Sequence, residues 1–153
     1  MKRFCLLLAG TLLATLLQAQ ELTVRDNKFY TPDGALFSGT YTEYFDSGQK
    51  RMERSIENGA VNGFCYVYHE NGIMKEQRFY TMGVKEGTWI TWNEKGVKTA
   101  EAGFRTGKKH GSWNIWDDNG KKRYRMYYEE GEKKGTWQIW DENGNLIKEI
   151  TYK

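Results

Sequence analysis

The sequence of 153 residues contains few of the residues that carry chemistry. It has one proline, two cysteines and two histidines. His69 and His110 lie at different distances from the glycines around them, so we interpret each as a solvated turn residue and do not expect a shared metal ion. No Ser-His-Asp or Cys-His arrangement has local support, and the paired carboxylates lie beside turn glycines. We therefore expect no catalytic residue, no metal site, no cofactor and no enzyme activity.

The chain has one long apolar run, and it lies at the amino terminus. Met1-Lys2-Arg3 is basic, Phe4 to Leu17 is apolar, and Gln18-Ala19 precedes polar residues. This pattern predicts a secretory signal peptide over residues 1–19, and a retained anchor is the alternative. Cys5 precedes the apolar run and does not fit a lipid-anchor cysteine, so the sequence indicates a secreted or periplasmic protein that is not a lipoprotein.

Removal of that segment leaves one cysteine and a net charge close to zero. Cys65 would be the remaining cysteine, so no internal disulfide could form, and we interpret Cys65 as a packed thiol. Lys+Arg falls from 23 to 21 against 20 Asp+Glu, which gives a net charge of about +1. Nucleic-acid binding needs a concentrated basic face, so we expect no nucleic-acid partner.

Glycine and tryptophan recur with a period of 24 residues. Three phases of this period hold 14 of the 17 glycines, and two further phases hold all six tryptophans. The glycines are Gly39, Gly63, Gly87, Gly111, Gly135; Gly48, Gly72, Gly96, Gly120, Gly144; and Gly59, Gly83, Gly107, Gly131. The tryptophans are Trp89, Trp113, Trp137 and Trp92, Trp116, Trp140. A fixed period of this length is typical of repeat architectures.

The period divides the chain into an N-terminal segment and five units. We expect residues 20–38 to form a cap strand followed by a turn at Thr31-Pro32-Asp33-Gly34. The five units are 39–62, 63–86, 87–110, 111–134 and 135–153. Each unit begins with two aromatic or apolar positions and continues through a polar turn, of which Glu70-Asn71-Gly72 is one example. Asn-Gly between such runs predicts a hairpin, because both residues tolerate the left-handed conformation that a tight turn needs. The G-x-x-x-G segments are expected to link one unit to the next.

These features predict an all-β fold, an elongated and twisted single-layer antiparallel sheet of tandem hairpins. Residues an even number apart in a strand share a face. We therefore expect one better-buried face and a more polar opposite face. The first should carry Trp89, Trp113, Trp137, Phe104, Tyr128 and Tyr152; the second should carry Tyr44, Tyr68, Trp92, Trp116 and Trp140. Large rings would then bury area where only one sheet's thickness is present.

The units resemble the MORN-repeat variant family of bacterial MORN-like repeats, of the YwqK-type, antitoxin-like group. The resemblance rests on Trp92 to Gly96, Phe104 to Gly107, Lys108-Lys109-His110-Gly111 and Trp113/Trp116, and it covers roughly residues 39–153. Units one and two depart most, with Cys65 and Ile56 in place of rings. The resemblance implies a twisted antiparallel sheet of hairpins and no catalytic residue.

Two sets of residues are candidate binding groups. The aromatic set is Tyr68, Trp92, Trp116 and Trp140, which could stack on sugar rings or anchor a protein; alternatively, these rings only pad the second face. The basic set is Lys108, Lys109, Lys133 and Lys134, within a stretch of net charge +4 over residues 105–134 that could attract anionic lipid or acidic glycan; alternatively, it is a solvated face.

The sequence thus predicts a binding or scaffolding module of the cell envelope. It would present an aromatic and basic sheet face to a protein, a glycan or an anionic surface. The alternative is an antitoxin or immunity protein that binds and blocks a cognate toxin. The sequence leaves the partner and the oligomeric state open.

Overall fold

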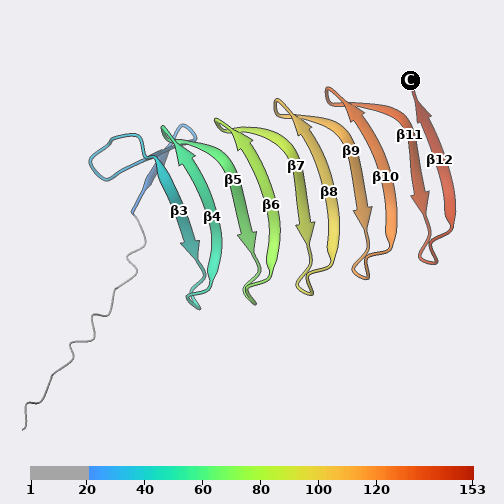
Figure 1. Cartoon of the computed structure of the whole chain (residues 1–153), viewed down its shortest axis with the longest axis horizontal. Helices are drawn as coiled ribbons and strands as arrows, with labels where there is room; N and C mark the ends of the chain where they lie inside the picture. Colours follow the sequence, from blue (N-terminus) through green and yellow to red (C-terminus); the bar gives the residue numbers. More distant parts are fainter. Residues whose placement is uncertain (1–20) are drawn as a thin grey trace, which may run out of the picture.

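A computed structural model describes residues 21–153 as an open, single-layer antiparallel sheet with a small hairpin at one end (Figure 1). Strands β3 to β12 form the ten-stranded sheet, and each pairs with its neighbours in sequence order. The strands of the sheet are β3 (Gly39–Tyr44), β4 (Lys50–Glu57), β5 (Ala60–Tyr68), β6 (Met74–Thr81), β7 (Val84–Trp92), β8 (Lys98–Arg105), β9 (Lys108–Trp116), β10 (Lys122–Glu129), β11 (Glu132–Trp140) and β12 (Leu146–Tyr152). The separate hairpin consists of β1 (Thr23–Arg25) and β2 (Lys28–Tyr30). This architecture confirms the predicted fold class.

The described residues form no helix, so none of them makes a helix that could cross a bilayer. The predicted signal peptide over 1–19 lies outside the described residues. Burial is shallow throughout the sheet, as expected for one layer. Within residues 21–153 only five apolar side chains are classed as buried, and no side chain is less than 2% exposed.

The predicted polar turns lie along the lower edge of the sheet in Figure 1. They contain three residues: the Gly72 amide donates to the His69 carbonyl, and the His69 amide donates to the Ile73 carbonyl. Gly72 has φ of +83°, whereas Asn71 is not among the residues with positive φ. The predicted hairpin forms here, but only the glycine takes the left-handed conformation that both residues tolerate, because a type I turn followed by a glycine bulge needs no more.

The two-residue left-handed turns lie instead along the upper edge. Met82-Gly83 has φ values of 46° and 83°, and Thr106-Gly107 has 45° and 82°. These mirror-image turns match the right-handed twist of the strands they join. Each turn glycine also bonds to the preceding unit: the Gly107 amide donates to the Lys85 carbonyl at 2.9 Å, and the Gly131 amide donates to the Lys109 carbonyl at 2.8 Å. The upper edge thus connects successive units.

The G-x-x-x-G segments are strand, not the predicted links. Strand β9 begins at Lys108, immediately after Gly107, and runs through Gly111. The register with β8 shifts between Ala102 and Phe104, opposite a bulge in β9 at Gly111, whose φ is +76°. A bulge inserts extra residues without ending the strand, and glycine accepts the unusual conformation at little cost. The second glycine of each motif therefore marks a bulge inside a strand.

An aromatic ladder crosses one face of the sheet from unit to unit, and we call this the ladder face. Its rings alternate between first and second strands, with centroids 4.7 to 5.3 Å apart. In order they are Tyr80, Trp89, Phe104, Trp113, Tyr128, Trp137 and Tyr152. This order confirms the predicted grouping. Tilted ring pairs at this spacing add about 0.5–1.5 kcal/mol each beyond the area they bury.

Each ladder tryptophan also bonds to the neighbouring strand beside the bulge. The Trp113 indole N–H donates to the Gly103 carbonyl at 2.9 Å, and Trp137 donates to the Tyr127 carbonyl at 3.1 Å. Bulges disrupt the regular ladder of backbone bonds, so the indole supplies a donor where the pairing is irregular. Ring stacking and hydrogen bonding therefore act at the same residue.

The N-terminal hairpin packs on the ladder face at the end of the sheet formed by β3 and β4. Phe29, Phe37 and Ile56 form the one buried cluster in residues 21–153, with exposed fractions of 6%, 7% and 4%. The Phe29 amide donates to the Gly59 carbonyl, and the Phe29 ring lies 5.6 Å from the Tyr41 ring. The turn that follows the hairpin forms as predicted: the Gly34 amide donates to the Thr31 carbonyl, and Gly34 has φ of +87°.

We expect Trp113→Ala to lower the free energy of unfolding by about 3 kcal/mol, because it removes two ring contacts and one hydrogen bond. Urea unfolding followed by circular dichroism measures this loss. Trp116→Ala, on the opposite face, is the matched control and should cost clearly less. An equal loss in the two variants would contradict the central role of the ladder.

A second expectation concerns Gly103, where an added Cβ would lie 2.1 Å from the His110 carbonyl oxygen. Gly103→Ala should lower the free energy of unfolding by about 1–3 kcal/mol, because the backbone of the β9 bulge must move. Ser55→Ala, at the same phase two units earlier, should change stability by less than about 0.5 kcal/mol. Thermal unfolding of both variants measures these changes. A Gly103→Ala variant as stable as the unaltered protein would refute the expectation.

Candidate functional site

The predicted aromatic set lies on the face opposite the ladder, which we call the stripe face. Within β9, Trp116 is two residues from Asn114, so these two side chains share a face. Trp116 is three residues from Trp113, so it points away from the ladder face. Rings alternate across the sheet with long flexible side chains of the paired strands. The cross-strand pairs are Tyr44 with Lys50, Tyr68 with Met74, Trp92 with Lys98, Trp116 with Lys122, and Trp140 with Leu146. Tyr68, Trp92, Trp116 and Trp140 are all half-buried.

Two lysines cover part of the Trp116 ring. Lys98 Nζ lies 4.6 Å from the ring centroid, and Lys122 Nζ lies 5.6 Å from it. Lys98 also pairs with Glu101 at 3.4 Å. The stripe is therefore a row of rings separated by aliphatic stems, not a row of fully exposed rings. Such flexible stems can move aside when a ligand stacks on the rings.

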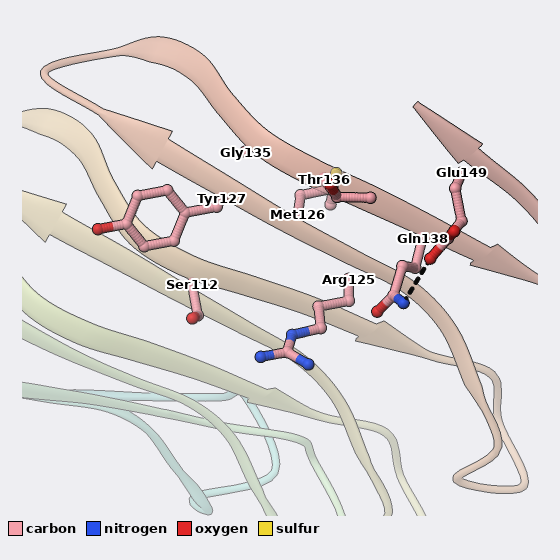
Figure 2. A pocket seen from close by; sticks show the side chains of 8 residues that line it. All are labelled: Ser112, Arg125, Met126, Tyr127, Gly135, Thr136, Gln138 and Glu149. Atoms are coloured by element: carbon pink, nitrogen blue, oxygen red, sulfur yellow. Dashed lines mark hydrogen bonds between the residues drawn. The ribbon is translucent and has the colours of Figure 1, made fainter. Parts of the chain in front are cut away.

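A shallow polar hollow lies on the stripe face (Figure 2). Its volume is about 480 Å³, and its lining includes Ser112, Arg125, Tyr127, Thr136 and Gln138. The Gln138 amide donates to Glu149 Oε1 at 2.8 Å. Gln138 is two residues from Trp140, so the polar hollow and the stripe ring adjoin along β11.

The same hollow occurs one unit earlier in the sheet. A second depression of about 370 Å³ is lined by Thr88, Glu101, Ser112 and Asn114, each 24 residues before a residue of the first hollow. The bulge glycines, Gly111 and Gly135, lie at corresponding positions in the two. The repeat therefore produces equivalent polar hollows in two successive units of the stripe face. Sequence parity put Arg125, Tyr127, Gln138 and Trp140 on one face, but only the bulge geometry reveals the hollows.

The structure divides the predicted basic set between the two faces of the sheet. Lys134 pairs across the strands with Tyr127, on the stripe face. Lys109 Nζ lies 4.5 Å from the Trp113 ring and 4.8 Å from the Tyr128 ring, on the ladder face. Lys133 lies in the same way over Trp137 and Tyr152, at 4.8 and 5.1 Å.

Lys85 repeats the arrangement over Trp89 and Phe104, and the sequence reasoning missed it. Of the remaining two lysines, Lys108 pairs with Glu130 at 3.6 Å, and Lys134 donates to the Lys153 carbonyl at 3.1 Å. The basic residues thus already have partners within the sheet, and three lysines act as covers of the ladder.

The residues considered for chemistry are separate from one another. Cys65 is 4% exposed, and burial raises the pKa of its thiol despite the nearby Arg54 and Arg78, which lower it. His69 Nε2 lies 2.9 Å from the Trp92 carbonyl oxygen, and His110 Nδ1 lies 3.5 Å from Glu130.

Turn carboxylates bond to their own turns. Asp141 Oδ1 accepts hydrogen bonds from the backbone amides of Asn143 and Asn145. A hydrogen bond from the Asn145 side chain and, after it, these backbone bonds lower the Asp141 pKa. Between residues 21 and 153, no group of three or more His, Cys, Asp or Glu side chains is arranged to hold a metal ion.

Comparison with known proteins finds a similarity to a repeat family in the C-terminal part of the chain. The family model described as MORN repeat variant matches residues 109–130 and 133–153. These segments correspond to β9–β10 and β11–β12, the last two hairpins of the sheet. A comparison with curated proteins finds no match. The last two hairpins are therefore similar to MORN repeat variants, a likeness that suggests a repeat binding or scaffolding module.

Proposed function

We propose that this protein is a secreted, non-catalytic scaffold that binds an extended polar polymer of the cell envelope, a glycan chain, along its stripe face. One observation carries the proposal. The hollow beside Trp140 and the hollow beside Trp116 share the same repeat positions and differ by one unit. A surface that repeats itself along one axis suits a ligand that also repeats along one axis.

The spacing supports a ligand that runs across the strands. Neighbouring strands lie about 4.8 Å apart, so equivalent hollows recur roughly every 9.6 Å along the sheet. A linear polymer can place successive residues over successive units, and each added contact then acts at high effective concentration. A compact ligand would occupy one hollow and gain nothing from the others.

The side chains offer the two kinds of contact that sugars use. A flat indole face such as that of Trp116 can pack against the apolar face of a sugar ring. The adjoining hollow supplies hydroxyl, amide and guanidinium groups from Ser112, Gln138 and Arg125 for hydrogen bonds to hydroxyl groups. A shallow site with few fixed polar groups gives modest affinity per unit, so binding strength would come from the repeats.

The charges favour a neutral polar ligand over an anionic surface. Glu101, Arg125 and Glu149 follow one another across the stripe face, so the row carries mixed sign. Lys109 and Lys133 lie on the other face, over ladder rings. An anionic surface would need unpaired positive charge on one side of the sheet. The proposal therefore does not use the basic set.

We expect Trp116→Ala to weaken binding to an immobilised polysaccharide by about tenfold, which corresponds to the loss of one central aromatic contact. The combined change of Trp92, Trp116 and Trp140 to Ala should abolish it. Biolayer interferometry against a panel of purified envelope polysaccharides, peptidoglycan included, measures both. Tyr124→Ala, on the ladder face, is the matched control and should bind as the unaltered protein does.

Other outcomes would reject the proposal. Unchanged binding by the triple variant, with an unchanged far-ultraviolet spectrum, would exclude the stripe face. Binding to anionic vesicles without any polysaccharide binding would favour a lipid-facing scaffold. Capture of one protein in equimolar amount from the native cells, with no polymer bound, would favour the antitoxin or immunity alternative.

The secretion part of the proposal has its own test. The signal peptide pattern predicts that the exported protein begins near Gln20. Mass spectrometry of the protein recovered from the cell envelope or medium should give the mass of the chain without residues 1–19. Recovery of the full-length chain only from the cytoplasm would contradict secretion and leave the stripe-face experiment unaffected.

A further inference from the structure

The ladder of rings is interrupted where the first unit meets the second. Three of the other four units carry Trp at the phase of Cys65, and the remaining one carries Tyr41. At the phase of Ile56 the later second strands carry Tyr80, Phe104, Tyr128 and Tyr152. Two neighbouring ladder positions therefore hold small or aliphatic side chains. Rings continue on both sides, with Phe29 and Tyr41 on one and Tyr80 and Trp89 on the other.

A cleft occupies the place of the missing rings. It has a volume of about 320 Å³, and its lining is more apolar than polar. Cys65 and Val61 from β5 line the cleft, and Val24 and Asn27 from the N-terminal hairpin line it too. A cavity of about 150 Å³ is enough to hold benzene, so this cleft has room for a ring with a substituent. It lies on the ladder face and is separate from the hollows of the stripe face.

Two arginines stand on either side of Cys65. The strand register places Arg54 and Arg78 directly opposite Cys65 on β4 and β6. Each guanidinium already lies over a ring on its outer side: Arg54 is 5.3 Å from the Phe29 centroid, and Arg78 is 5.4 Å from the Trp89 centroid. A guanidinium plane accepts an aromatic ring on its face. A ring placed above Cys65 would therefore continue the alternation of rings and cations.

The charges at the cleft argue for a neutral ligand. Arg54 donates to Glu43 at 2.7 Å, and Arg78 pairs with Glu76, so each guanidinium has its own carboxylate. Cys65 adds no charge, because burial favours the protonated thiol. An anion would meet two carboxylates beside the two arginines. The carboxylates would not repel a neutral aromatic ring.

One polar atom remains without a partner beside the cleft. Arg54 Nε is buried and makes no hydrogen bond to any group in residues 21–153. A buried N–H without a partner destabilises the protein, and a ligand oxygen could relieve it. Among ring ligands this favours one that carries a hydrogen-bond acceptor, such as a phenol.

We propose that this cleft binds the phenol ring of a tyrosine side chain from a partner polypeptide, between Arg54 and Arg78 and beneath the N-terminal hairpin. The ring fills the positions that Cys65 and Ile56 leave open, and its oxygen accepts a hydrogen bond from Arg54. The two departures from the repeat, Ile56 in the first unit and Cys65 in the second, would together form the socket for this ring. This inference does not depend on the stripe-face proposal.

The test titrates N-acetyl-tyrosinamide into the isotopically labelled full chain and follows amide shifts in two-dimensional NMR spectra. We expect saturable shifts at Cys65, Val61 and Tyr80, and at least tenfold weaker binding of N-acetyl-leucinamide. Cys65→Trp fills the socket with the side chain of the later units and should weaken binding at least tenfold. Cys65→Ala keeps the space open and should bind within twofold of the unaltered protein.

Clear results would overturn the proposal. Equal affinity for the leucine and tyrosine probes would make the cleft a general apolar depression. Absence of saturable shifts at the cleft in both the unaltered protein and Cys65→Ala would also reject it, even if Cys65→Trp failed to fold. Trp116→Ala should leave tyrosine binding unchanged, so that loss of polysaccharide binding and loss of tyrosine binding report on different faces.

Discussion

Contact between the side chains of neighbouring strands is the interaction on which this structure depends. A single-layer sheet cannot enclose a core, and the described residues contain only one small buried cluster, at the N-terminal hairpin. Elsewhere the ladder from Tyr80 to Tyr152 joins each strand to the next through ring contacts of 4.7 to 5.3 Å. Each unit is therefore stabilised mainly by its neighbours, as in other one-dimensional repeat arrays.

This dependence explains the positions of the charged residues on the ladder face. Lys85, Lys109 and Lys133 each place an ammonium group within 5.3 Å of two successive ladder rings. Their aliphatic stems can cover apolar surface that one sheet alone would leave exposed, while the charge stays near water. A basic pair that in the sequence suggests an anionic partner thus contributes to the fold itself.

The candidate binding surfaces lie where the ladder leaves space, on the opposite face and at the gap in the ladder itself. The ladder consumes one face, and the bulges needed to place its tryptophans leave regular hollows on the other. Where Ile56 and Cys65 replace aromatic rings in the ladder, a cleft lies beneath the N-terminal hairpin. The candidate binding surfaces therefore follow from the repeat itself and from its departures in the first two units.

The 24-residue period was enough to predict the strands, their antiparallel order and which rings share a face, because side-chain direction in a strand alternates with period two. It could not predict which turn would be left-handed, since Asn71-Gly72 and Met82-Gly83 differ in how many residues the loop must span. Nor could it separate Lys109 from Trp116, which the register places on opposite faces. Turn geometry, bulges and the cleft at Cys65 depend on how neighbouring strands meet, and those contacts exist only in the folded sheet.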